Sequence, residues 1–452
     1  MPTYALSALI LSLLCSSFVL AQPRVISMEE ATTLALQKNI DVLQTQSNID
    51  AAKAGVLSAY GGYLPSLSAR GNWGRSQSQR TSASVQIIEG NPVTREEDLF
   101  GVEESWTTGV SSSLTIFDGL AREARLGAAK SQEAIVENTS LRTRQSVAYG
   151  VISGYLNIMR TKALVGVVEE NLRRDLRQLE RITESSRVGA LSLADVYRQQ
   201  SQVANDELDL INAQNSHEKA KVDLVALIGL DPSLEYEFSD PTIRAEIDST
   251  EVAETMQRYS NYDRLVGSAM TSRPDYLAAS QQLDAAESGV TIARSGYFPF
   301  VNASAGYSNF SNELAQLAMN RNYTLSWGIG ISWSLFDRFQ TNESLQSAMV
   351  QRRNAEINLS QTEKDINVQV RKALLDLDAA RKSWEVSEKV MVSASEDRKI
   401  AEERYNLGAG TLLDLLVANA SLVNAQATRV NAIAGYLIAK FNLEYVIGER
   451  AY

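Results

Sequence analysis

Cysteine and histidine are almost missing from this chain. Cys15 is the single cysteine and His217 the single histidine among 452 residues. Disulfide frameworks, His or Cys metal clusters, and Ser-His or Cys-His catalytic pairs all need more of these residues than the chain holds. We therefore expect no catalytic residues, no metal site and no cofactor, and predict that the protein is not an enzyme.

Blocks of positive charge are missing as well. The chain has 43 Lys and Arg against 54 Asp and Glu, a net charge of -11, and its cations are nowhere clustered. Nucleic acid is excluded as a partner, because binding it relies on clustered cations that displace counterions from phosphate. Beyond Ala21 no run reaches the roughly 18 consecutive apolar residues of a membrane-spanning helix. If the protein crosses a membrane, it must do so with strands.

Proline is scarce and unevenly placed. None of the eight prolines lies between Val93 and Asp231 or between Phe300 and Tyr452. Since proline breaks helix interiors, both windows can hold very long helices. Apolar residues recur there at spacings of three and four, a pattern typical of a coiled-coil seam: Val165, Val168, Leu172, Leu176, Leu179 and Ile182.

The first 21 residues resemble a secretory signal peptide. Met1 to Ala21 carries no charged side chain, is apolar from Leu9 to Leu20, and ends in small residues that predict cleavage before Gln22. Leu14 precedes Cys15 where a lipoprotein signal has a small residue, so a lipid anchor is not expected.

The remaining chain is one unit written twice. Four pairs of matching positions are separated by the same 219 residues (336 - 117, 408 - 189, 414 - 195 and 448 - 229): Phe117 and Phe336, Gly189 and Gly408, Asp195 and Asp414, Gly229 and Gly448. Upstream, Pro65 and Pro299 match at an offset of 234 (299 - 65), which places loops of different length between each proline and the Phe that follows it. We predict a first repeat at 22–229, a linker at 230–261 and a second repeat at 262–452.

Each repeat is predicted to run helix, strand pair, very long helix, short turn, helix. In the first copy the helices are expected at about 28–60, 121–187 and 192–228. The middle one would be roughly 100 Å long at 1.5 Å per residue, and its neighbours about half that. Two shorter helices stacked end to end would match one long helix.

The segments between the helices change period from 3.6 to 2. From Tyr323 to Leu335 every second residue is bulky and apolar, and the residues between are small or polar. Residues 301–308, 106–116 and, more weakly, 67–73 alternate in the same way. A half-buried strand of a soluble sandwich shows this alternation too, but thirteen residues exceed the usual soluble strand and suffice for a tilted membrane strand. Four strands cannot close a barrel, so the barrel must be shared between chains. The predicted interfacial aromatic anchors are Trp106, Trp327, Trp333 and Tyr323.

With these helices, strands and repeats, the chain resembles the TolC family of outer membrane efflux proteins. The resemblance spans both repeats and rests on Ala35 to Asn39, Arg273-Pro274-Asp275, the Phe-Asp pairs after the strands, and Gly followed six residues later by Asp in both turns. It implies a homotrimer in outer membrane lipid, with a twelve-stranded barrel and a periplasmic helical tunnel, in a Gram-negative bacterium. It further implies a passive duct for efflux of small molecules such as drugs or metals, or for type I secretion. Its partners would be an inner-membrane pump and a periplasmic adaptor.

The fold expected is therefore an α+β membrane protein with internal duplication. Long antiparallel coiled-coil helices would form a periplasmic α-barrel, and four strands per chain would join a shared transmembrane β-barrel. The alternative is a periplasmic coiled-coil adaptor or structural rod without a barrel. It would share the helices, but it has no reason to carry a thirteen-residue strand with one bulky apolar face.

The resemblance also implies a gate at the two helical turns, where rings of like side chains would set what passes. Asp195 and Asp414 are the acidic candidates, Tyr405 is the hydrogen-bonding tyrosine, and Tyr197 is a weaker one. The turn glycines Gly189 and Gly408 would end the preceding helices.

A structural role for the two aspartates stays open. Ser192 to Asp195 and Thr411 to Asp414 both fit the Ser/Thr-x-x-Asp helix-start pattern, so each carboxylate can serve as a cap alone. The chain also departs from the family, which often has a basic residue where Gly410 stands and a second acid where Val417 stands. His217 is expected to be a solvated side chain.

Overall fold

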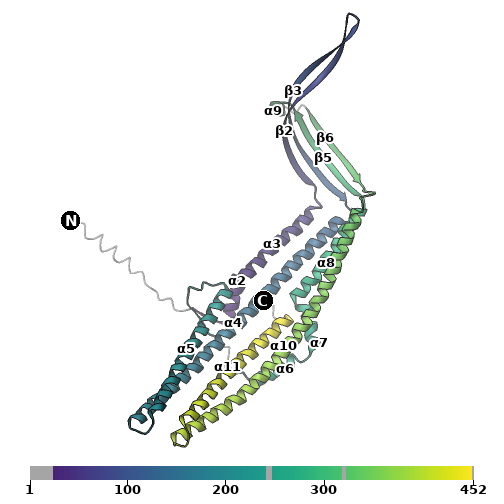
Figure 1. Ribbon diagram of the computed structural model, residues 1–452. Helices are drawn as coiled ribbons and strands as arrows, with labels where there is room; N and C mark the ends of the chain where they lie inside the picture. Colours follow the sequence, from purple (N-terminus) through teal and green to yellow (C-terminus); the bar gives the residue numbers. More distant parts are fainter. Residues whose placement is uncertain (1–23, 241–246, 318–321, 450–452) are drawn as a thin grey trace, which may run out of the picture. The chain divides into compact units, whose positions relative to one another are not determined.

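The computed structural model describes residues 24–240, 247–317 and 322–449, with the backbone alone at 88, 91, 93 and 95–99. The predicted signal peptide at 1–21 lies outside these residues. The first repeat comprises α2 (Met28–Lys38), α3 (Ile40–Gly61), β2 (Ser66–Ile88), β3 (Asn91–Phe117), α4 (Ala121–Arg187) and α5 (Leu193–Ile228) (Figure 1). The second comprises α7 (Tyr262–Ser272), α8 (Pro274–Arg294), β5 (Phe300–Ser311), β6 (Tyr323–Ser332), α10 (Gln340–Asn406) and α11 (Leu412–Ile447). The short elements are β1 (Arg24–Ile26), β4 (Tyr236–Phe238), α6 (Ser249–Arg258), η1 (Ser295–Tyr297) and α9 (Leu314–Leu317).

The internal duplication is confirmed, residue for residue, in the long helices. α4 and α10 are both 67 residues long and begin 219 positions apart (340 - 121). α5 and α11 are both 36 residues long and also begin 219 apart (412 - 193). Gly229 and Gly448 end α5 and α11 with φ of 81° and 70°, a left-handed conformation that glycine adopts without a Cβ penalty.

The single helix predicted at 28–60 is wrong, because Asn39 divides it into α2 and α3. Asn39 is extended (ψ 133°), and its side-chain oxygen accepts hydrogen bonds from the backbone N–H groups of Asp41 and Val42. Its side-chain amide donates to the carbonyl of Leu227 in α5 at 2.8 Å. One asparagine therefore starts α3 and ties it to a helix 188 residues away.

The sheet has the order β2-β3-β5-β6, with every neighbouring pair antiparallel. β6 is ten residues long and not thirteen, because its partner β5 begins at Phe300, opposite Ser332. Trp333 therefore follows the strand, and its indole N–H donates to the carbonyl of Tyr297 at 3.1 Å. The odd-numbered residues of β6 face the same side as Val110 of β3 and Tyr307 of β5.

β2 and β3 form a much longer hairpin than the sequence predicted. They pair from Ser66 with Ser113 to Ile88 with Asn91, whereas β5 begins to pair with β3 at Trp106. The loop expected between Pro65 and Phe117 is therefore mostly strand, ending in a turn at Glu89 and Gly90 with positive φ at both positions. Both faces of this ribbon are rich in Ser, Thr, Gln and charged residues, so it lacks the alternation by which a strand is recognised.

The chain divides into two compact units, and each takes segments from both repeats. Unit 1 comprises Met1–Ser47, Asn138–Leu277 and Thr362–Tyr452, and unit 2 comprises Asn48–Glu137 and Ala278–Gln361. Unit 1 contains the buried clusters described below, and unit 2 contains the four-stranded sheet.

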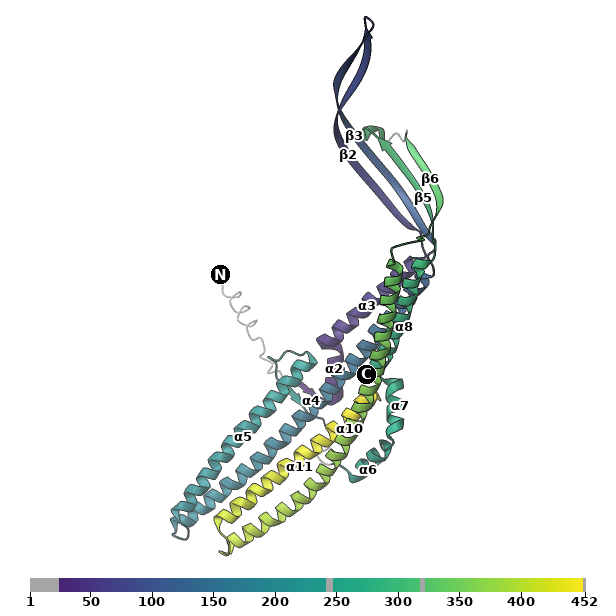
Figure 2. The same cartoon turned by 45° about the vertical axis from the view of Figure 1, so that its right-hand side comes forward.

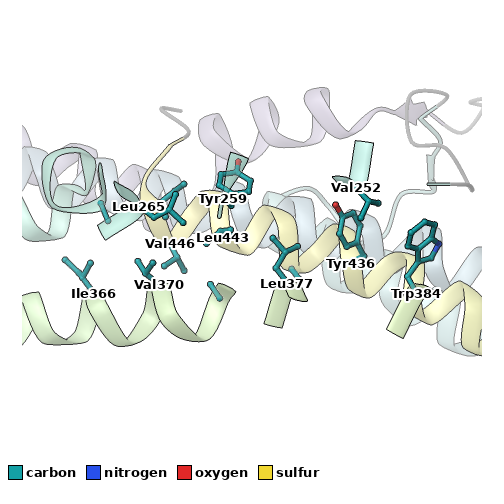
Figure 3. Close-up of a cluster of buried hydrophobic side chains, with 14 of the residues drawn as sticks. Val252, Tyr259, Leu265, Ile366, Val370, Leu377, Trp384, Tyr436, Leu443 and Val446 are labelled. Carbon is teal, nitrogen blue, oxygen red and sulfur yellow. The ribbon is translucent and has the colours of Figure 1, made fainter. Parts of the chain in front are cut away.

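The largest core of unit 1 joins α10, α11 and the short helices α6 and α7 (Figure 3). Val370, Leu377 and Leu443 are fully buried there. A second cluster joins β1, β4 and α4, where Tyr155 packs edge-to-face on Phe238 and its hydroxyl donates to the carbonyl of Ile26 at 3.0 Å. α4 is also the one helix among the described residues that is long and apolar enough, by length and composition, to cross a membrane.

The predicted coiled-coil seam of α4 is only partly buried. Ile182 is 1% exposed, but Leu176 is 45% exposed. The buried stripe beside it contains Asn171, Asp175 and Gln178. Spacings of four, three and four from 171 to 182 make one helix face, so the core-facing side of α4 is largely polar near its end.

Candidate functional site

The candidate site lies where two helical hairpins of unit 1 turn. α4 with α5 and α10 with α11 each form an antiparallel pair, and both turns lie at the same end of the unit (Figures 1 and 2). Gly189 and Gly408 occupy equivalent places in the turns, with φ of 77° and 71°. An added Cβ would meet nothing within 4 Å at either position, so backbone conformation alone requires glycine there.

Asp414 lies in a complete capping box at the start of α11. The Asp414 N–H donates to Thr411 Oγ1 at 3.2 Å, and the Thr411 N–H donates to Asp414 Oδ2 at 2.9 Å. The backbone and hydroxyl hydrogen bonds from Thr411 lower the pKa of Asp414, which is exposed to solvent. The carboxylate is thus ionised and holds the helix start, while its charge remains accessible.

Asp195 has the equivalent place at the start of α5. Its N–H donates to Ser192 Oγ at 3.3 Å, and the Ser192 hydroxyl donates back to Asp195 Oδ2 at 2.9 Å. Arg198, one turn further along α5, lies 3.5 Å from Asp195 Oδ1. The Asp195 charge is therefore partly neutralised within its own helix.

The two candidate tyrosines differ in their surroundings. Tyr405 is half-buried against the cluster of Ile182, Val196 and Leu412, which joins α4, α5 and α11. Burial, followed by the charge of Asp195, raises the pKa of Tyr405. Its enclosed hydroxyl has no hydrogen-bond partner within the described residues. Tyr197 is 65% exposed on α5. Tyr405 thus lies between the hairpins, and Tyr197 does not.

A polar contact that the sequence did not reveal joins the two hairpins directly. Arg181 of α4 donates to Gln178 and lies 3.8 Å from Glu402 of α10. Glu402 also pairs with Arg398 at 2.9 Å, and Arg398 donates to Asn419 of α11 at 3.2 Å. These residues lie within long polar helices, where nothing in the spacing distinguishes them from solvated side chains.

The two departures from the family pattern are visible at the same end. Val417 is 58% exposed, so the place of a second acid is taken by an apolar surface residue. Gly410 lies close to Arg404, whose Cβ would be 3.2 Å from an added Cβ.

His217 of α5 lies away from the turns and is not simply solvated. Its Nδ1 is 3.1 Å from the Thr161 hydroxyl, and burial lowers its pKa.

Three of the four predicted membrane anchors, Trp106, Trp327 and Tyr323, lie on the sheet of unit 2, and Trp333 follows its last strand. Trp327 is 84% exposed, and the other large odd-numbered residues of β6 are also well exposed: Tyr323, Leu325, Ile329 and Ile331. Tyr323 stacks on Tyr307 with ring centroids 5.9 Å apart, and Trp106 lies 5.9 Å from Trp73 across the β2–β3 pair. A contiguous apolar face of this kind requires a lipid or protein neighbour.

Among the described residues no group of three or more His, Cys, Asp or Glu is arranged to hold a metal ion. The end of unit 1 that carries the two turns, here called the tip, thus has ion pairs and hydrogen bonds that join the two hairpins. Such an arrangement can hold the hairpins together or release them.

The family comparison matches most of the chain. The sequence profile of the family described as "Outer membrane efflux protein" matches residues 32–230 and 265–449. The chain is 25% identical over 406 residues to Protein CyaE of Bordetella pertussis, covering 90% of this chain and 80% of that protein. It is 23% identical over 427 residues to the Outer membrane protein TolC of Vibrio cholerae, covering 93% and 90%.

Solved structures share the fold. The outer membrane protein VceC of Vibrio cholerae superposes with a TM-score of 0.77 at 22% identity, over 93% of this chain and 96% of that one. CusC superposes with a TM-score of 0.75 at 17% identity, over 93% and 92%.

Proposed function

The chain belongs to the outer membrane efflux protein family and is an exit-duct subunit of the outer membrane, and from this premise we propose that the two helical turns of unit 1 form the gate of the duct. The observation that carries the proposal is the contact of Arg181 with Glu402, which joins α4 to α10 beside the turns. In this proposal the gate is closed while the two hairpins are held together and opens when they separate.

The contact of Arg181 with Glu402, here called the clamp, is weak enough to form and break reversibly. Arg181 and Glu402 have side chains that are 56% and 30% exposed, and such ion pairs contribute about 0–1 kcal/mol each. Three symmetry copies would multiply a weak contact into a closed state that a partner protein can still open. Asp195 and Asp414 contribute negative charge at the entrance in addition to starting their helices.

A trimer would account for the open edges and the exposed apolar face of the sheet. β2 and β6 are open edges of a four-stranded sheet whose apolar face is exposed, and unpaired strand edges are not tolerated in lipid. Three copies joined edge to edge would give a twelve-stranded barrel. A periplasmic adaptor or rod without a barrel leaves the exposed face of β6 unexplained.

The partners follow from the same premise. Relatives include a protein named "Probable efflux pump outer membrane protein TtgC" of Pseudomonas putida, 24% identical over 429 residues. We propose that this chain likewise receives its cargo from an inner-membrane pump through a periplasmic adaptor, and that it has no catalytic activity of its own. The cargo would be small molecules or a type I secretion substrate.

Single-channel recording in planar bilayers tests the gate. Arg181→Ala and Glu402→Gln should each raise the conductance of the resting channel, and the double variant should not exceed the larger single effect, because both remove one contact. Arg173→Ala is the matched control, since the ion pair of Arg173 lies within α4, with the partly exposed Glu170 at 3.2 Å. Resting conductance equal to wild type in both clamp variants would remove the clamp from the gate.

A further inference from the structure

Two carboxyl groups are buried on α4 and α5, the helices that run side by side to the first turn (Figure 2). Asp175 of α4 is 1% exposed and Asp206 of α5 is 3% exposed. Both belong to unit 1, and the Asp206 carboxyl is within hydrogen-bonding reach of Asp175. Such a pair is costly to bury, so its state of charge matters for how the two helices pack.

Each carboxyl uses one oxygen to accept from a neutral amide. Asn419 of α11 donates to Asp175 Oδ1 at 3.4 Å, and Gln202 donates to Asp206 Oδ1 at 2.9 Å. The second oxygens, Oδ2 of both residues, are enclosed and accept from no donor within the described ranges of the chain. The amide of Gln199 donates to the backbone carbonyl of Asp175 at 3.2 Å and not to either carboxyl.

One proton between the two carboxyls would satisfy both remaining oxygens. Two ionised carboxylates within hydrogen-bonding reach of each other in a buried site repel each other, as in acid dyads that share a proton. A carboxylic acid on one side donates to the carboxylate on the other. This leaves a single negative charge in the site.

The surrounding charges decide which residue holds the proton. Arg174 of α4 interacts favourably with Asp175, and Arg398 of α10, which is paired with Glu402, is also nearby. Asp209, one turn along α5, disfavours a charge on Asp206, and α11 contributes the neutral Asn419. The proton therefore belongs on Asp206 and the charge on Asp175.

Burial, followed by the hydrogen bond and charge of Asp175, raises the pKa of Asp206 to about 7. The site therefore titrates at the pH of ordinary surroundings, where an exposed aspartate is always ionised.

We propose that Asp175 and Asp206 bind one proton between them, and that its loss pushes α4 and α5 apart near the tip and loosens the gate in alkaline solution. The last step rests on the proposed function. The contacts of Asn419 lead from this pair to the tip, because Arg398 bonds both Asn419 and Glu402, and Glu402 contacts Arg181. A movement of α4 against α5 would thus reach the clamp.

The test measures the distance between the two helices and does not depend on ion flow. Cysteines replace the exposed residues Glu180 of α4 and Gln200 of α5, and both are spin-labelled in a chain whose Cys15 is changed to Ser. Labelled chains are assembled with an excess of unlabelled chains, so that the measured distance lies within one subunit. Electron spin resonance distances are then recorded from pH 5 to pH 9.

In wild type we expect the distance to increase and its distribution to broaden with a midpoint near pH 7, by about 2 Å as for other helix shifts at a switch. Asp206→Asn keeps a permanent donor toward Asp175 and should hold the short distance at every pH. Asp209→Asn removes a carboxylate that disfavours a charge on Asp206 and should move the midpoint to lower pH. Glu207→Gln, an exposed change on the same helix, is the matched control and should behave as wild type.

Coincident curves for wild type and Asp206→Asn would overturn the shared proton. Conductance measured on the same proteins separates the two proposals. If the distance responds to pH and the conductance does not, the proton site stands and the turns are not the gate. If neither responds while Arg181→Ala still raises conductance, the gate stands and the proton site falls.

Discussion

Arg273 and Asp275 form a two-point ion pair at the boundary between α7 and α8. Nε donates to Oδ1 at 3.0 Å and Nη2 to Oδ2 at 2.6 Å, although Arg273 is only 2% exposed. The remaining nitrogen donates to the carbonyl of Val446 in α11 and to Gln369 of α10. Pro274, between the pair, begins α8 at a position where no backbone donor is needed. One buried cation therefore joins four helices of unit 1.

Replacing this arginine should be strongly destabilising. Arg273→Met removes both charged hydrogen bonds to the Asp275 carboxylate and the side-chain donor to the carbonyl of Val446. We expect the free energy of unfolding to fall by about 3 kcal/mol or more. Chemical denaturation of the assembled protein in detergent, followed by helical circular dichroism, measures the loss. Arg264→Met, an exposed change on α7, should be close to neutral. Equal midpoints for the two variants would contradict the assigned role.

The ion pair of Arg273 with Asp275 also makes the stability of the fold depend on pH in the acid range. Burial alone would raise the pKa of Asp275, but the hydrogen bonds from Arg273 and the charges of Arg142 and Arg273 outweigh it and lower the pKa. A carboxylate with a lowered pKa stabilises the fold above its ordinary value of 3.8, and the contribution is lost as pH falls through the lowered value.

Asp206 should produce the opposite dependence. Its pKa is raised from 3.8 to about 7, so between these values the folded chain holds a proton that the unfolded chain has released. The contribution to stability is fully present below pH 3.8 and is lost as pH rises through about 7. Between these values the unfolding equilibrium constant rises roughly tenfold for each pH unit. Across this range the unfolding temperature should fall with rising pH more steeply in wild type than in Asp206→Asn. Parallel profiles for the two proteins would argue against the raised pKa.

Asp414 should affect both stability and permeation, and the two effects can be separated. Asp414→Ala removes the charge and half of the capping box, and we expect weaker block by multivalent cations together with a loss of about 1 kcal/mol. Thr411→Ala removes the cap but keeps the carboxylate, so it should lose similar stability and keep the block. Single-channel recordings with added multivalent cations measure the block. If Thr411→Ala weakens block as much as Asp414→Ala, the effect is one of capping and the charge has no role of its own.

The two faces of β6 should respond differently to charge. Trp327→Lys places a cation on the apolar face and should cost about 2–4 kcal/mol if that face meets the bilayer midplane. Ser326→Lys, one residue earlier, places the same charge on the opposite face and should be tolerated, with an effect on ion selectivity. The fraction of protein recovered as assembled species in outer membranes measures insertion. Equal recovery of the two variants would place the odd-numbered residues of β6 outside the lipid.

Local features of the sequence were enough to predict much of this protein. Proline-free windows predicted the long helices, and Gly189 and Gly408 within those windows predicted the turns, because backbone conformation at a helix end depends on the residues next to it. The constant offset of 219 predicted two copies in fixed register. Alternation in β6 predicted its two faces, since the period of a strand is a property of its own residues.

Only the tertiary structure decided where distant residues meet. The sequence does not show that Asn39 breaks a helix by reaching Leu227, or that Phe300 ends the partner strand so that Trp333 lies outside β6. It also does not show that Asp175, which lies beside the predicted apolar seam, faces Asp206 from the neighbouring helix. A carboxylate in a polar helix looks the same in the sequence whether it meets water or another carboxylate. Its pKa and its role depend on atoms supplied by other helices, and packing alone brings those atoms to it.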